Sequence, residues 1–385
     1  MNLFFSVADY SSELYAEKII NNLINTVNGK FFVIGGKVLK NLASNFPERI
    51  NFWLDSVKYS SIGLFENLDL IPGMYLDYLK LKKFIFSNVV DWAVLFDAPA
   101  VNIQLIKTFK KLGTKVVYVI PPKSWSTQRT NVHKFVEENC DLVIVPFKFN
   151  LKTYVGKNVF YLGHPIVDVI DKEIFCSFNK ENLSVFPGSR RFEVNFISRL
   201  VFDNLDKLAS GFKEVWISST FVTEEAINKI LAKRIQRKDL KISGDYYEIV
   251  GNTGLALATS GTVVLKNSLL LLPTICFYKL YKISEFIFRK IKRIDMEKFS
   301  LPNILWNYEF GMGDEEIVPE LIQENYNLSK LMETLQKVLD NYDLFVDKLK
   351  LFRKMFLELS SYGAIDRISL LLKEFFTKNK GVLNY

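Results

Sequence analysis

The chain alternates, almost from its first residue, between short apolar runs typical of buried strands and longer stretches with the apolar spacing of helices. Strands separated by helical patterns predict βαβ units, and therefore a parallel sheet with helices on both faces. The alternation starts again after Gly163-His164-Pro165. The expected strands are 2–7, 31–34, 89–96, 115–120, 141–145, 183–186, 214–218 and 255–258, and the expected helices are 12–27, with Ser11 or Ser12 as its cap, 102–112, 193–208, 224–234, 263–272, 328–339 and 342–357.

This restart predicts an α/β fold made of two Rossmann-like domains that face each other across a cleft. The helix breaker Pro165 and the charged run 168–173 place the domain boundary between residues 160 and 180. We expect residues 1–165 to form the first domain and residues 166–340 to form the second. Residues 341–385 are helical in pattern, and we expect them to pack back on the first domain.

Size and hydropathy narrow the class of protein. A chain of 385 residues is long enough for two or three domains, and an apolar content of 49% argues against disorder. No run approaches the roughly 18 apolar residues of a membrane-spanning helix, because Lys266 and Asn267 interrupt the most apolar region. No basic segment precedes the apolar run 2–8, which fits a first strand better than a signal peptide. We therefore expect a cytoplasmic protein, soluble or peripheral to a membrane.

The composition also bounds the chemistry. The three cysteines are scattered without a C-x-x-C pair and only two histidines occur, so neither a disulfide framework nor a zinc site is expected. No Asp-x-Asp triplet is present to hold a divalent metal on a diphosphate, and we expect no metal or cofactor. The net charge of +8 and the 33 Phe and 17 Tyr suit a phosphate-bearing partner, which could be nucleic acid, a nucleotide or anionic lipid.

The sharpest local motif spans residues 183–193, where an apolar strand enters the tight turn Pro187-Gly188-Ser189 and a helix follows. Free backbone N–H groups and the positive end of the helix dipole then point at one spot. Arg190 adds a guanidinium whose fork suits a diphosphate. The alternative is an ordinary strand-to-helix turn, in which Ser189 caps the helix and Arg190 is solvated.

A second strand end of this kind is Ser260-Gly261-Thr262, which follows the run 255–258 and feeds another helix. Two such helix starts at one edge of a sheet fit nucleotide binding better than either does alone. Neither turn is a Walker A loop or a G-x-G-x-x-G fingerprint. Ser260 acting only as a helix cap is the alternative.

In the first half, Asp97 stands directly after an apolar strand and just ahead of a helix. A carboxylate at that edge of a sheet can serve as a general base, and it can equally be the N-cap of the helix 102–112. His164 is either a packed hinge residue or a catalytic one. The polar segment 300–303 predicts a loop.

Two stretches suit an anionic, apolar surface because basic and aromatic residues alternate in them with helical spacing. Ordinary amphipathic helices packed on a sheet are the alternative for both. The residues expected to face a membrane are Lys80, Lys82, Lys83, Phe84 and Phe86 in the first stretch, and Arg289 and Lys290 in the second.

Taken in order, these motifs resemble those of the lipid-A-disaccharide synthases, a family of inverting glycosyltransferases with the two-Rossmann GT-B architecture. The resemblance covers about residues 2–323, and it depends on the order and spacing of the motifs more than on any single triplet. The matching segments are 62–66, 97–102, 122–125, 142–147, 163–165, 187–193, 260–262, 300–303 and 318–323.

In that family the enzyme joins UDP-2,3-diacylglucosamine to 2,3-diacylglucosamine 1-phosphate and releases UDP, at the inner face of the cytoplasmic membrane. The resemblance implies an acceptor domain followed by a UDP-sugar domain, no nucleic-acid partner, and a homodimer as an open option. It implies that Asp97 is the base that deprotonates the acceptor hydroxyl. The UDP-sugar residues would be Gly188, Ser189, Arg190, Ser260, Gly261, Thr262, Asn303, Glu320 and Gln323, and those of the acceptor or cleft Asp9, Ser11, Asn102 and His164.

Four departures from the family pattern mark this chain as a divergent member. The segment 7–13 keeps its carboxylates but lacks both glycines, and Lys266 stands where the family has a Glu near the nucleotide hydroxyls. The Trp-Ala-Trp-Arg pattern is reduced to 125–129, and residues 306–315 look like an insertion. The alternatives are another GT-B transferase or epimerase acting on a sugar nucleotide, and a catalytically inactive, membrane-associated relative.

Overall fold

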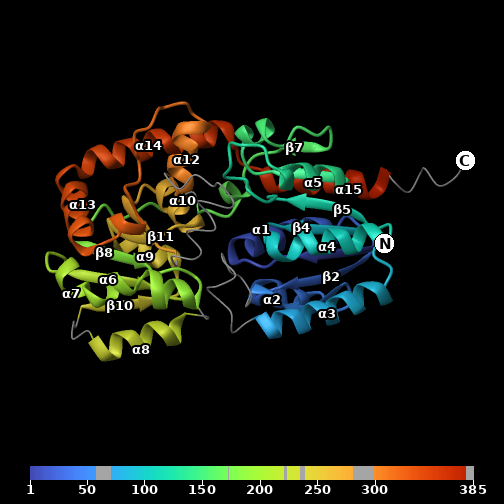
Figure 1. The fold of residues 1–385 in the computed structure, drawn as a ribbon, viewed down its shortest axis with the longest axis horizontal. Coiled ribbons are helices and arrows are strands. Elements are labelled where there is room, and N and C mark those ends of the chain that lie inside the picture. Colours follow the sequence, from blue (N-terminus) through green and yellow to red (C-terminus); the bar gives the residue numbers. More distant parts are fainter. Residues whose placement is uncertain (58–70, 172, 221–222, 235–238, 281–297, 379–385) are drawn as a thin grey trace, which may run out of the picture. The chain divides into compact units, whose positions relative to one another are not determined.

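The computed structural model describes residues 1–57, 71–171, 173–220, 223–234, 239–280 and 298–378 (Figure 1). Within them the chain forms two compact units. Unit 1 holds the residues up to 170 together with those from 357 onward, and unit 2 holds the residues from 171 to 356. In the part of the chain described here, no helix is both long and apolar enough to cross a membrane.

Unit 1 is built on a seven-stranded parallel sheet with the strand order β3-β2-β1-β4-β5-β6-β7. The register pairs Phe4 with Phe32 on one side of β1 and with Ala93 on the other. The elements are β1 (Asn2–Ser6), α1 (Tyr10–Ile24), β2 (Lys30–Gly35), α2 (Lys37–Asn45), β3 (Ile50–Asp55), α3 (Ile71–Ser87), β4 (Trp92–Phe96), α4 (Pro99–Lys111), β5 (Lys115–Val119), α5 (Asn131–Asn139), β6 (Leu142–Val145), η3 (Lys148–Lys152), β7 (Val159–Tyr161), η4 (Pro165–Asp168) and α15 (Ala364–Lys378).

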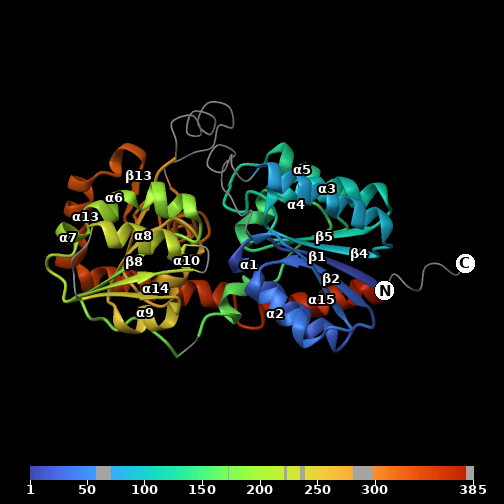
Figure 2. The same cartoon turned by 90° about the horizontal axis from the view of Figure 1, so that it is seen from below.

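Helices cover both faces of this sheet, as the alternating pattern predicts (Figure 2). On one face α3, α4 and α5 bury a cluster that includes Phe4 and Tyr118, and on the other α1, α2 and α15 bury Phe5 and Trp92. Strand neighbours alternate between these two clusters because successive side chains of a strand point to opposite faces.

The last helix, α15, completes the second of these faces. Its residue Phe376 packs against Trp92 with ring centroids 5.2 Å apart. The Asp168 carboxylate, at the end of η4, accepts hydrogen bonds from the N–H groups of Gly363 and Ile365, at 2.7 Å each. Unit 1 therefore extends to residue 170, past the boundary expected at 165.

Unit 2 has a six-stranded parallel sheet with the order β10-β9-β8-β11-β12-β13. One face carries η5, α6, α7, α8 and α13, together with Phe345 of α14, and α9 lies on the other (Figure 2). The elements are β8 (Asn182–Phe186), η5 (Glu193–Ile197), α6 (Arg199–Asp203), α7 (Leu205–Leu208), β9 (Glu214–Ser218), α8 (Glu224–Arg234), β10 (Leu240–Ser243), α9 (Tyr246–Asn252), β11 (Leu255–Thr259), α10 (Thr262–Leu269), β12 (Thr274–Tyr278), α12 (Leu301–Tyr308), β13 (Glu320–Ile322), η7 (Gln323–Asn325), α13 (Leu328–Asp340) and α14 (Tyr342–Leu359), whose end from Leu357 belongs to unit 1.

The expected strands and helices are confirmed in type and order, with three local corrections. The cap of α1 is Asp9, whose Oδ1 accepts a hydrogen bond from the Ser12 N–H at 3.0 Å, rather than Ser11 or Ser12. The stretch expected as one helix, 193–208, is a π-helical turn followed by two short α-helices. Residues 301–303 open α12 instead of forming a loop, because a proline is well accommodated in the first helical turn.

Candidate functional site

Both sheets have their topological switch point beside their first strand. In unit 1 the order reverses between β1 and β4, and in unit 2 it reverses between β8 and β11. Ligands of open parallel sheets bind at the carboxyl ends of the strands at such points. The loops that follow these four strands contain Asp9, Asp97, the turn 187–190 and the turn 260–262, so the sequence motifs lie where binding is expected.

Asp97 follows β4 in a strained backbone conformation. Asp97 and Ala98 have positive φ angles of 40° and 43°, in the left-handed region that Asp adopts occasionally and Ala rarely. Helix α4 begins at Pro99 with Ala98 as its N-cap residue, so the expectation that Asp97 caps this helix is wrong. The Asp97 side chain is partly exposed at the edge of the sheet.

Hydrogen bonds from buried side chains hold this strained turn. The Asp97 carbonyl accepts from the Tyr118 hydroxyl at 2.6 Å and from Asn102 Nδ2 at 2.8 Å. Asn102 Nδ2 also donates to the Phe96 carbonyl at 2.9 Å, and Asn102 Oδ1 accepts from the Ser6 hydroxyl at 2.7 Å. Asn102 is fully buried, so its side chain positions Asp97 and is not available to an acceptor. Sequence reasoning missed Ser6 and Tyr118.

Asp9 lies at the same edge, after β1. Its Oδ1 caps α1, and its Oδ2 is buried without a hydrogen-bond partner among the described residues. Burial, and after it the charges of Asp9 and Asp97, raises the pKa of the Tyr15 phenol above its ordinary value. The two carboxylates thus lie close enough to act on one ring. Ser11, in the first turn of α1, is partly exposed.

His164 is packed inside unit 1. Its Nδ1 accepts a hydrogen bond from the Ile166 N–H at 3.0 Å, and its ring lies 5.0 Å from that of Phe147 and 6.0 Å from that of Tyr15. Burial lowers the pKa of His164 to about 3. The imidazole is therefore neutral at pH 7, which fits the packed hinge residue better than an acid–base catalyst.

The turn after β8 differs from the expected anion cradle, because a side chain of the protein already fills it. One Glu193 oxygen accepts from the N–H groups of Ser189 and Arg190, at 2.7 and 3.2 Å, and the other pairs with Arg190 Nη1 at 2.8 Å. A Cβ on Gly188 would come within 2.2 Å of this carboxylate, so glycine is required there. Glu193 follows Arg190 by three residues, the spacing at which a Glu in the first turn of a helix reaches back to the N–H of the capping residue. This spacing could have indicated from the sequence that Glu193 fills the turn.

The turn after β11 is open. The N-cap of α10 is Gly261, which has no side-chain cap, and Ser260 instead donates to the Phe299 carbonyl at 3.1 Å, so the helix-cap alternative for Ser260 is wrong. No described residue accepts a hydrogen bond from the N–H groups of Gly261, Thr262 or Val263. A Cβ on Gly261 would meet nothing within 4 Å. Of the two turns, this one has donors ready for an anion.

The remaining expected UDP-sugar residues are engaged inside unit 2. The Glu320 carboxylate accepts from the N–H groups of Phe299 and Ser300, the Ser300 hydroxyl and Asn303 Nδ2, at 2.6–2.9 Å. Asn303 Oδ1 accepts two further backbone N–H groups, and Gln323 Oε1 accepts from the Leu280 N–H at 2.8 Å. Asn303 binds Glu320, Glu320 binds the backbone of Phe299, and the Phe299 carbonyl accepts the hydrogen bond from Ser260. Glu320 and Asn303 therefore fix the segment that holds Ser260 in the open turn.

Lys266 places a cation near that turn. It follows Thr262 by four residues, so both lie on one face of α10, and its side chain leans toward the start of the helix. Its Nζ lies 3.6 Å from the centroid of the Tyr246 ring, and no described carboxylate is within ion-pair distance. Burial lowers the pKa of Lys266 to about 8.

Replacing Lys266 by Met is expected to stabilise unit 2 at pH 7. The folded state disfavours the ammonium, so the unfolded chain binds more protons between about pH 8 and 10.5 and the penalty disappears as the pH rises through that window. After allowance for the lost contact with Tyr246, we expect a gain of about 1–2 kcal/mol, roughly 2–8 °C in melting temperature.

Thermal unfolding at pH 7 and pH 9.5 measures this effect, with the exposed Lys40→Met in α2 as a control. The gain for Lys266→Met should shrink at the higher pH, and the control should show no such trend. A gain of equal size at both pH values would contradict the assignment of the effect to the buried charge.

Helix α3 shows which of the expected membrane-facing residues are exposed. Lys80, Lys82, Lys83 and Phe86 are exposed, with Phe86 at 53%. Phe84 was expected to face a membrane, but it lies on the side of the helix that meets the sheet. Its ring packs against those of Phe32 and Trp53, with ring centroids 5.2 Å apart in both pairs. Exposed Tyr75, Leu76 and Leu79 extend the apolar part of the outer face. Arg289, Lys290 and the segment 62–66 lie outside the described residues.

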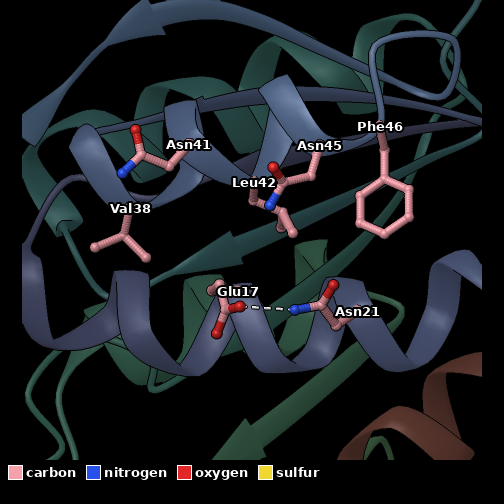
Figure 3. A pocket seen from close by; sticks show the side chains of 7 residues that line it. All are labelled: Glu17, Asn21, Val38, Asn41, Leu42, Asn45 and Phe46. Atoms are coloured by element: carbon pink, nitrogen blue, oxygen red, sulfur yellow. Dashed lines mark hydrogen bonds between the residues drawn. The ribbon is translucent and has the colours of Figure 1, made fainter.

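A hollow of about 450 Å³ lies between α1 and α2 (Figure 3). It is lined by Glu17, Asn21, Val38, Asn41, Leu42, Asn45 and Phe46. Glu17 and Asn21 hydrogen-bond each other across one turn of α1, at 2.6 Å. No residue of the sequence motifs lines this hollow, so it is separate from the carboxyl edge of the sheet.

Known proteins match the chain over most of its length. Residues 3–375 match the family described as Lipid-A-disaccharide synthetase. The Lipid-A-disaccharide synthase of Sulfurihydrogenibium sp. (strain YO3AOP1) is 29% identical over 418 residues, covering 98% of this chain and 99% of that protein. That of Aquifex aeolicus (strain VF5) is 29% identical over 303 residues, covering 76% of this chain and 80% of that protein.

Solved structures share the fold at low identity. S. aureus MnaA, solved with UDP, has a TM-score of 0.60 at 11% identity, with 97% of this chain and 96% of that chain covered. Arabidopsis thaliana UGT89C1 complexed with UDP has a TM-score of 0.59 at 11% identity, with 97% and 99% covered. Together with the two Rossmann-ordered sheets and the match over residues 3–375, these findings show that the chain is a GT-B glycosyltransferase that belongs to the lipid-A-disaccharide synthase family.

Proposed function

We propose that the protein transfers 2,3-diacylglucosamine from its UDP conjugate to 2,3-diacylglucosamine 1-phosphate, with inversion at the anomeric carbon and release of UDP. The observation that carries this proposal is the pair of switch points, one with the carboxylate of Asp97 and the other with the open start of α10. Family membership supplies the substrate class.

In this proposal unit 2 binds the donor. The unpartnered N–H groups at the start of α10 and the positive end of its dipole bind the diphosphate and stabilise the charge that builds on it as it departs. Arg190, paired with Glu193 through Nη1, supplies guanidinium N–H donors after β8. Lys266 adds a cation on α10, four residues after Thr262.

Unit 1 supplies the base. Asp97 takes the proton of the acceptor hydroxyl as the hydroxyl oxygen forms a bond to the anomeric carbon, and the bond from that carbon to the diphosphate breaks in the same displacement. One such step inverts the configuration. The strained turn keeps the carboxylate at the strand end, because Asn102 and Tyr118 fix its backbone from inside.

Measuring UDP release from UDP-2,3-diacylglucosamine, with and without 2,3-diacylglucosamine 1-phosphate, tests this function directly. We expect release only when both substrates are present, together with a disaccharide product. Release of UDP without the acceptor would favour another sugar-nucleotide enzyme. Tight UDP binding without any turnover would favour an inactive relative.

The outer face of α3 is proposed to hold unit 1 at an anionic membrane surface. Lys80, Lys82 and Lys83 can each contribute about 1 kcal/mol near anionic lipid, and Phe86 with Leu76 can insert into the interface. Diacylated substrates reside in a bilayer, so an enzyme that uses them needs such a surface.

Replacing Lys80, Lys82 and Lys83 by Glu should lower co-sedimentation with anionic vesicles, because the substitution reverses attraction into repulsion. Wild-type binding should weaken in added salt without being abolished, since apolar insertion is not screened. UDP affinity should stay unchanged.

The matched control replaces Lys337, Lys350 and Lys354, exposed on α13 and α14, by Glu, which changes the net charge equally. Equal losses in both triple variants would show a general charge effect and contradict a surface on α3. If the wild type does not bind anionic vesicles even at low salt, that result would also contradict a membrane-binding surface on α3.

A further inference from the structure

The loop after β5 holds an indole ring in solvent. Trp125 is 45% exposed, whereas Trp92, Trp216 and Trp306 are 3–5% exposed and Trp53 is partly buried. Among the described residues, the Trp125 ring makes no contact with another aromatic ring or with a cation. Nearly half of this side chain is therefore exposed and available to a ligand.

The loop belongs to the edge that carries Asp97. Strands β4 and β5 are neighbours, with Phe96 paired to Val119. The Asp97 N–H donates to the Val119 carbonyl at 3.1 Å, so the turn after β4 and the loop after β5 leave the sheet side by side. Trp125 follows six residues after Val119.

The backbone around Trp125 is fixed in place. Asn150 Nδ2 donates to the Ser124 carbonyl and the Tyr154 hydroxyl to the Pro122 carbonyl, both at 2.6 Å and both buried. Ser124 is 5% exposed, next to the exposed indole. Two residues of the loop, Ile120 and Lys123, have φ angles of 56° and 58°, a strained conformation for side chains of this size.

This combination indicates a role in binding. A flexible loop would fold an apolar ring onto the surface, whereas here buried hydrogen bonds and strained backbone keep the ring outward at the edge where ligands bind. A flat indole presents an apolar face to the C–H groups of a sugar ring or to a hydrocarbon chain.

We propose that Trp125 binds the acylated acceptor sugar by packing its indole ring against the apolar surface of that molecule. This inference rests on the proposed function, in which unit 1 supplies the base to the acceptor. Trp125 then determines the affinity for the acceptor and has no effect on the affinity for the donor.

Quenching of tryptophan fluorescence by iodide tests this contact without turnover, since iodide reaches exposed indoles far more readily than buried ones. Adding 2,3-diacylglucosamine 1-phosphate to the wild type should protect a fraction of the emission. Trp125→Phe should lack that fraction, Trp53→Phe should keep it, and UDP alone should give no protection. The deacylated sugar phosphate as a second probe distinguishes packing on the sugar ring from packing on the acyl chain.

Kinetics give the second readout. Trp125→Ala should raise the acceptor KM about tenfold, with Trp125→Phe in between and the donor KM unchanged. Unprotected wild-type emission at saturating acceptor, or equal KM values in wild type and Trp125→Ala, would overturn the proposal. If the acceptor protects the wild-type emission from iodide but the enzyme releases no UDP, the proposed function would be contradicted and the contact with Trp125 would still hold.

Discussion

Replacing Asp97 by Asn is expected to lower kcat by roughly 10²–10⁴-fold, the usual contribution of a general base. Asn keeps the shape of the side chain and tolerates the left-handed backbone almost as well as Asp, so the turn at φ 40° should persist. The hydrogen bonds from Asn102 and Tyr118 reach the backbone carbonyl of residue 97 and are unaffected. The substitution therefore removes the base with little other change.

Turnover under saturating substrates measures the effect. UDP affinity and melting temperature should match those of the wild type, because the donor binds to unit 2 and the turn is intact. Turnover within threefold of the wild type would rule out Asp97 as the base. A large fall accompanied by lower stability would instead point to the turn.

Replacing Thr262 by Pro is expected to weaken UDP binding by about 10–150-fold. Proline is favoured as the first residue of a helix, and Gly261 before it is already extended, with φ 161° and ψ −170°. The variant thus removes one backbone N–H and preserves the helix. A hydrogen bond to a charged group contributes about 1.5–3 kcal/mol, which corresponds to the expected loss.

Thr262→Ala is the matched control, because it removes the hydroxyl and keeps the N–H. Calorimetric titration with UDP should give near wild-type affinity for Thr262→Ala and weak binding for Thr262→Pro. Equal affinity in Thr262→Pro and wild type would place the diphosphate elsewhere. Equal losses in both variants would assign the contact to the hydroxyl.

The sequence predicted the architecture well because the fold class follows from the spacing of the apolar residues and from the order in which strand and helix patterns alternate. Apolar runs such as 183–186 and 214–218 became strands with nearly the expected bounds. The orientation of Phe84 was also within reach, since Leu81 and Ile85 define the buried side of α3 and Phe84 lies beside it. Residues 341–385 were expected to pack back on the first domain, and α15 belongs to unit 1, whereas α14 up to Phe356 belongs to unit 2. The pattern could not show which residues pair there, because the contacts are about 340 residues apart, such as Asn22 with Asp366.

The site was predictable in its location and less so in its contacts. Strand ends identified Asp97 and the turns 187–190 and 260–262, since the carboxyl edge of a parallel sheet is where loops converge. Whether a backbone N–H is free depends on which side chain reaches it, and Glu193 reaches the first turn while nothing described reaches the second. Asn303 and Glu320 likewise carry the right chemistry for a ligand but use it to fix the chain behind Ser260.

Helix α15 has a consequence for how this protein is made. During synthesis residues 1–170 leave the ribosome first, yet one face of their sheet is closed by Ile368, Leu372 and Phe376, near the end of the chain. Until those residues emerge, Trp92 and its neighbours on that face stay uncovered while all of unit 2 is translated. The first unit to be synthesised is therefore the last to be completed, and a chain that stops short of α15 leaves an aggregation-prone intermediate.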